Sequence, residues 1–84
     1  MDIRVGKVTH YYNRVSVAVL ELTGELKVGE TIHICGRITD FEQRVGSMEI
    51  EHQKIQSAES GKEVALEVTE PVRKGDIVFK CMKD

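Results

Sequence analysis

The sequence predicts an all-β protein, specifically a small closed antiparallel β-barrel of about six strands. Three observations support this fold class. Apolar residues recur at every second position in several short segments, as in strands with one buried face. No segment sustains the spacing of an amphipathic helix, and turn-forming residues separate the apolar segments at short intervals.

Each expected strand follows from this alternation. In chain order the strands cover approximately residues 3–11, 15–22, 31–36, 41–50, 63–68 and 76–81. The side chains expected inside the barrel are Ile32, Ile34, Val64, Leu66, Ile77 and Phe79. Because Ile32 and Ile34 point inward, His33 and Cys35 are expected to face outward.

Two of these strands break their own alternation. Val5 and Val8 have opposite parity across Gly6, and the apolar residues on either side of Gly46 conflict in the same way. The apolar residues before and after each glycine can lie on the same face only if the strand contains one extra residue between them. We therefore expect a β-bulge at each glycine. Bulges bend strands, as a small closed barrel requires.

Two turns share one pattern, a glycine followed by an acid at the start of an apolar strand. The first is Gly29-Glu30, within the run 24–34, and the second is Gly75-Asp76. Glycine adopts positive φ at little cost, and we expect the acid to be solvated or to bond nearby backbone.

The order of these features resembles the second, β-barrel domain of translational GTPases such as elongation factor Tu and initiation factor two. The resemblance rests on residues 6–8, 24–34, 41–50, 58–61 with Val64 and Leu66, and 75–78. It implies a barrel of the translation-factor domain-two type, here as a small stand-alone protein. Barrels of this superfamily also occur in a ribonucleoprotein subunit and at the end of some collagenase-related peptidases.

Length, charge and cysteine content narrow the classes of protein to which this chain can belong. The 84 residues fit a single domain over 1–84, and 12 basic against 14 acidic residues give a formal net charge of -2. Strong non-specific nucleic-acid binding is therefore not expected. Two widely spaced cysteines, with no signal peptide and no long apolar stretch, predict a cytoplasmic protein without a membrane segment.

Enzymatic motifs are missing. The phosphate loop of GTPases is absent, since the nearest glycine spacing, Gly24 to Gly29, is followed by Glu30 and Thr31 with no lysine. No nucleotide is expected. Scattered carboxylates, serines and histidines give no argument for a catalytic group, so we expect no catalytic residue and no enzyme activity.

His33-x-Cys35 is the sharpest metal or redox candidate, because alternate residues of a strand point the same way. Cys81 shares the parity of Ile77 and Phe79 and is expected to face inward. Opposed faces would exclude a disulfide and a shared metal, so neither a metal site nor a cofactor is expected.

Two surface segments are candidates for binding a partner. Tyr11, Tyr12 and Arg14 lie at an expected hairpin tip, where rings and a cation suit stacking on bases or gripping a peptide. The alternative is that one tyrosine caps the barrel end and the other is an exposed turn residue. The second segment covers residues 37–44, from the loop into the fourth expected strand. In it the resemblance nominates Arg37, Gln43 and Arg44, while an ordinary exposed mixed-charge loop is the alternative.

The sequence-based hypothesis is a non-enzymatic binding module of the translation-factor kind, contacting RNA, the ribosome or a translation-related protein. The alternative is an accessory β-barrel subunit of a peptidase or of an RNA-modifying enzyme. Residues 19–22 carry no basic side chain where elongation factor Tu has them, so aminoacyl-tRNA binding in that manner is not expected. The identity of the partner and the oligomeric state stay open.

Overall fold

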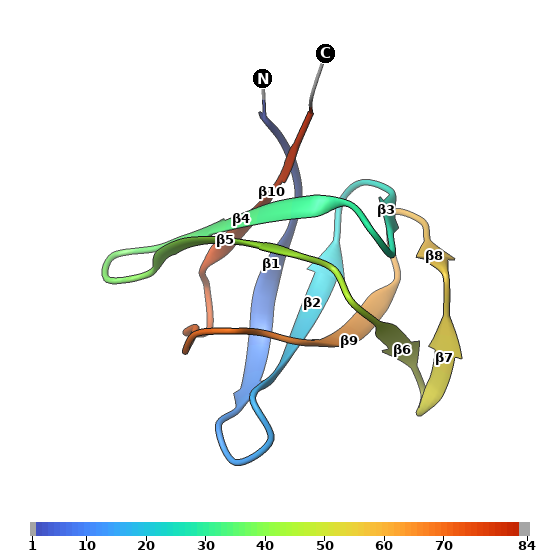
Figure 1. The fold of residues 1–84 in the computed structure, drawn as a ribbon, viewed down its shortest axis with the longest axis horizontal. Helices are drawn as coiled ribbons and strands as arrows, with labels where there is room; N and C mark the ends of the chain where they lie inside the picture. The colour runs from blue at the N-terminus through green and yellow to red at the C-terminus, as the bar shows by residue number, and fades with distance from the viewer. Residues whose placement is uncertain (1, 83–84) are drawn as a thin grey trace.

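Ten β-strands make up the structure, a computed structural model that describes residues 2–82 (Figure 1). They are β1 (Asp2–Tyr12), β2 (Val17–Leu22), β3 (Leu26–Lys27), β4 (Thr31–Cys35), β5 (Asp40–Arg44), β6 (Met48–Ile50), β7 (Gln53–Ile55), β8 (Ser57–Ala58), β9 (Glu63–Glu67) and β10 (Ile77–Cys81). The all-β prediction is confirmed. Within residues 2–82 there is no helix that is both long and apolar enough to span a membrane.

Eight of the strands form one sheet in the order β5-β4-β10-β1-β2-β9-β6-β7, and β3 pairs with β8. All the pairings are antiparallel. Among the described residues this order ends at β5 and β7, so the closed barrel is not confirmed. A side chain links β5 to the end of β9 instead: Gln43 Nε2 donates to Glu67 O at 2.9 Å, and Thr69 N donates to Gln43 Oε1 at 2.7 Å.

The core confirms the expected inward residues of two strands and corrects those of a third. Ile32, Ile34, Val64 and Leu66 are all buried. In β10, however, Val78 is the buried residue, and Ile77 and Phe79 are only half-buried. Their prediction as core residues was wrong. Residues 77–79 are all apolar, so alternation does not show which of them points inward, and the pairing of β10 with β4 decides it. Val78 pairs with the buried Ile34.

One of the two expected bulges is confirmed. The register of β1 against β10 shifts between Arg4 and Gly6. The bulge expected at Gly46 was wrong, since residues 45–47 interrupt the expected strand and separate β5 from β6. Val45 N donates to Glu30 O at 2.8 Å and Gly29 N donates to Val45 O at 2.8 Å, so Val45 pairs with a turn instead of continuing a strand.

A short hairpin of β6 and β7 was not predicted. Glu51 and His52 form its turn, both at positive φ. The exposed Gln53 and Lys54 of β7 supply no apolar alternation, which explains why this strand left no signal.

The two glycine-acid turns are confirmed in detail. Gly29 and Gly75 have φ of 97° and 95°. Glu30 Oε1 accepts a bond from Lys27 N at 2.7 Å, and Asp76 Oδ2 accepts one from Arg73 N at 2.8 Å. Each acid thus bonds the backbone three residues earlier and fixes the entry to the next strand.

Candidate functional site

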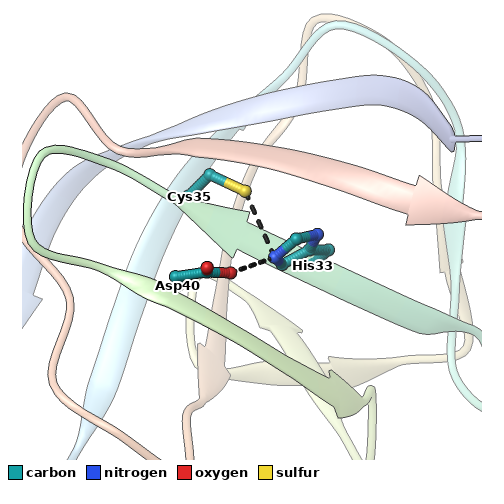
Figure 2. A group of neighbouring side chains, drawn as sticks. All are labelled: His33, Cys35 and Asp40. Carbon is teal, nitrogen blue, oxygen red and sulfur yellow. Dashed lines mark hydrogen bonds and ion pairs between the residues drawn. The ribbon is translucent and has the colours of Figure 1, made fainter.

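A histidine, a cysteine and an aspartate converge on the β4–β5 hairpin (Figure 2). His33 and Cys35 are alternate residues of β4 and therefore share a face, while Asp40 is directly opposite Cys35 on β5. The connecting turn is closed by Gly36 N donating to Thr39 O at 2.7 Å. The hairpin register thus brings together three residue types that can bind metal.

One ring nitrogen lies at the centre of this cluster. His33 Nε2 is 2.5 Å from Asp40 Oδ1 and 3.3 Å from Cys35 Sγ, and the three ligand atoms all lie within 4.8 Å of one another. The other ring nitrogen, Nδ1, is 4.0 Å from Asp2 Oδ2 on β1. The cluster is half-buried at His33 and Cys35 and open to solvent at Asp40.

This geometry does not suit nucleophilic catalysis. In a cysteine-histidine-acid triad the thiol and the acid contact different ring nitrogens, whereas here both contact Nε2. Burial, followed by the negative charges of Asp40, Asp2 and Asp76, raises the pKa of the Cys35 thiol. A reactive cysteine needs a lowered pKa, so the arrangement argues against a thiol protease.

Cys81 lies on the face opposite to the one expected. It shares the parity of Phe79, which pairs with His33, so Cys81 is on the outer face together with Cys35. The absence of a disulfide still holds, because both cysteines are free. The reason is distance, and not opposed faces as expected. The residue opposite Cys35 is Ile77, and Cys81 lies four residues further along β10, about 13 Å from Ile77.

A groove of about 820 Å³ opens beside the cluster. Three chain segments line it: the β1–β2 hairpin, the β4–β5 hairpin and the connection from β9 to β10, which lies between the two hairpins in Figure 1. Its lining is mixed, with the apolar Phe41 and Val72 beside the charged Asp40, Glu70 and Arg73. Ile38, also in the lining, is 71% exposed.

The expected hairpin tip exists, and its two tyrosines differ. Tyr11 packs against the core and lines the groove. Tyr12 is exposed and its ring lies 4.3 Å from that of His10, while Arg14 is exposed in the turn. One tyrosine thus contacts the core and the other is exposed, as in the alternative, although Tyr12 is the last residue of β1 and not part of the turn. Partner binding by this tip stays a prediction.

The three residues of the second segment divide between a turn and a strand. Arg37 is exposed in the β4–β5 turn, next to the groove residue Ile38. Gln43 bonds the backbone at the end of β9, and Arg44 Nε donates to Gly29 O at 3.1 Å. Gln43 and Arg44 thus form hydrogen bonds to backbone groups of other segments, and any role in partner binding is untested.

Asp40 and Ile38 lie within the candidate segment 37–44, but sequence reasoning did not single them out. Asp40 joins His33 and Cys35 only through the register of the β4–β5 pair. Gly36 at the start of a short turn was the available signal, since a turn over 36–39 places residues 35 and 40 opposite each other. Ile38 had no signal beyond being an apolar residue in an expected loop.

No protein-family model matches the chain. Among curated proteins, it is 41% identical over 78 residues to an uncharacterized protease of Methanocaldococcus jannaschii, a match that covers 92% of this chain and 19% of that protein. It is 35% identical over 83 residues to a collagenase of Porphyromonas gingivalis, covering 96% of this chain and 20% of the collagenase. The chain thus spans about a fifth of the length of these relatives.

Among solved structures, the fold is similar to the C-terminal domain of a Geobacillus thermoleovorans protein named as a U32 peptidase. The TM-score is 0.88 at 18% identity, over 93% of this chain and 91% of that one. At this identity the likeness concerns the fold alone.

These findings correct the translation-factor interpretation. The relatives are named protease and collagenase, and the structural neighbour is a peptidase domain, not the second domain of a translational GTPase. The hypothesis of a module for RNA, the ribosome or a translation-related protein was therefore wrong. The error has a physical origin, because strand alternation and glycine turns specify a small β-fold and do not distinguish the proteins that use it.

Proposed function

We propose that residues 1–84 form a single accessory domain of a protease, one that has no catalytic activity of its own and holds polypeptide substrate for a separate catalytic region. The observation that carries this proposal is the pattern of matches. A protease and a collagenase match nearly all of this chain, while the chain spans only about a fifth of either.

The arrangement of the site supports a binding role over a catalytic one. His33 directs the same nitrogen toward both Cys35 and Asp40, and the pKa of the Cys35 thiol is raised, chiefly by burial. Neither feature prepares a nucleophile for attack on a peptide bond.

The groove supplies the surface for a polypeptide. Its volume of about 820 Å³ is within the usual range for ligand sites. The exposed Ile38 offers an apolar contact, and Asn13, Ser16 and Thr69 offer polar side-chain atoms. Phe41 belongs to β5, the end strand of the sheet order, and such a strand can pair with an extended chain.

The test is to titrate the purified chain with gelatin, an unfolded polypeptide, and to assay it alone for gelatin cleavage. We expect binding without cleavage, and we expect Ile38→Ser to weaken the binding. Ile3→Ser is the matched control, since Ile3 is also an exposed isoleucine but is not among the residues lining the groove. Equal binding by both variants would remove the groove from the proposal, and cleavage by the chain alone would overturn the accessory role.

A further inference from the structure

We propose that His33, Cys35 and Asp40 bind one transition-metal ion of the zinc class. The three donors are an imidazole nitrogen, a sulfur and a carboxylate oxygen, all within 4.8 Å of one another on the β4–β5 hairpin (Figure 2). This mixture is typical of zinc and cobalt sites, whereas magnesium and calcium prefer oxygen donors alone.

The distances fit a tetrahedral ion after a small adjustment. With metal bonds of about 2.0 to 2.3 Å, tetrahedral donors lie about 3.3 to 3.6 Å apart. Cys35 Sγ and His33 Nε2 are already 3.3 Å apart. Asp40 Oδ1, at 2.5 Å from the same nitrogen, must move outward, and its side chain is free to do so because it is 82% exposed.

The surroundings also favour a bound cation. Asp2 Oδ2 lies 4.0 Å from His33 Nδ1, on the side of the ring away from Cys35 and Asp40. At this distance the Asp2 carboxylate forms no direct hydrogen bond to the ring, but its negative charge favours a cation bound nearby. Three protein donors leave a fourth tetrahedral position for water or for a group from a bound polypeptide. Of the three donors, Asp40 is the one that also lines the groove.

Metal binding at this site releases one proton from the Cys35 thiol. The Cys35 thiol loses its proton to solvent as the metal–sulfur bond forms, His33 binds through neutral Nε2, and Asp40 binds as carboxylate. No electron is transferred. Affinity should therefore rise with pH as protons compete less for the donors.

Cobalt titration of the metal-free chain tests this proposal. We expect one cobalt per chain, a thiolate-to-cobalt charge-transfer band in the near ultraviolet and visible bands of tetrahedral strength. Cys35→Ser should abolish the charge-transfer band, and Cys81→Ser, which removes the other cysteine, should leave it unchanged. Asp2→Asn should also weaken binding, because it removes a negative charge close to the site.

His33→Gln and Asp40→Asn provide independent checks, since Asp40 is exposed and its replacement leaves the core intact. Both should weaken cobalt binding while circular dichroism still reports a β-protein. The proposal is overturned if the wild type gives no charge-transfer band, if the band survives Cys35→Ser, or if Cys81→Ser alone removes it.

Discussion

Gly36 lies against the buried carboxyl group of Asp76, so closely that a methyl group at Gly36 would be 2.6 Å from Asp76 Cγ. Asp76 is held in place because its Oδ2 accepts a bond from Arg73 N at 2.8 Å. This contact joins the β4–β5 turn, which lies between the candidate metal ligands of β4 and of β5, to the turn before β10.

Gly36→Ala should therefore destabilise the protein. The new methyl group must displace a fixed carboxyl group, and overpacking of this kind costs about 1 to 3 kcal/mol. Gly46→Ala is the matched control, since nothing lies within 4 Å of a methyl group there and its φ is not positive. Urea denaturation of both variants measures the difference, and equal stabilities would show that Asp76 moves aside freely.

Leu66→Ala should lower the free energy of unfolding by about 2 to 5 kcal/mol, because the side chain is 2% exposed and its loss leaves a cavity. In a chain of 84 residues this is a large share of the total stability. Ile38→Ala, at a position 71% exposed, should change it by less than about 0.5 kcal/mol. Thermal and urea denaturation provide the measurement, and similar losses in the two variants would contradict the burial pattern.

Gln43→Ala should cost about 1 to 2 kcal/mol, since it removes the side-chain bonds to Glu67 O and Thr69 N. Hydrogen exchange should also speed up at the Thr69 amide, which loses its acceptor. Gln53→Ala, on the exposed strand β7, is the control and should have little effect on either measurement. Unchanged exchange at Thr69 in Gln43→Ala would show that this link is not formed in solution.

Cys81 should react slowly with iodoacetamide at neutral pH. Burial, then the charges of Asp2 and Glu42 and a hydrogen bond to Glu42, raise the pKa of its thiol. In a Cys35→Ser background, which leaves one cysteine, the reaction rate should rise with pH around a midpoint above that of an ordinary thiol. Glu42→Gln should lower this midpoint, because a neutral neighbour opposes the thiolate less, and the distant Glu63→Gln should not. An unchanged midpoint in Glu42→Gln would show that the Glu42 carboxylate does not raise the pKa of the Cys81 thiol.

Local chemistry made part of this structure predictable. Gly29-Glu30 and Gly75-Asp76 specify their turns through backbone conformation and a bond three residues away, so their geometry follows from the sequence. The inward orientation of Ile32 and Ile34 follows equally well, because polar neighbours mark the opposite face. By contrast, Ile77, Val78 and Phe79 are all apolar, and only the pairing with β4 decides which one is buried.

The candidate site was only partly predictable for a similar reason. The spacing of His33 and Cys35 places them on one face, but Asp40 joins them through strand pairing, which no local pattern reports. The function required comparison with relatives. Glycine turns and alternation fit a translation-factor barrel and a peptidase domain equally well, since both need the same short, bent strands.

The central claim, an accessory domain of a protease, is tested most directly by exchange in the Porphyromonas gingivalis collagenase. Three forms are compared for gelatin cleavage: the complete enzyme, the enzyme without its matched segment, and the enzyme with that segment replaced by this chain, which is 35% identical to it. Circular dichroism confirms folding of each form. We expect deletion to reduce cleavage and replacement to restore it. A folded replacement enzyme that stays at the activity of the deleted form would contradict the claim.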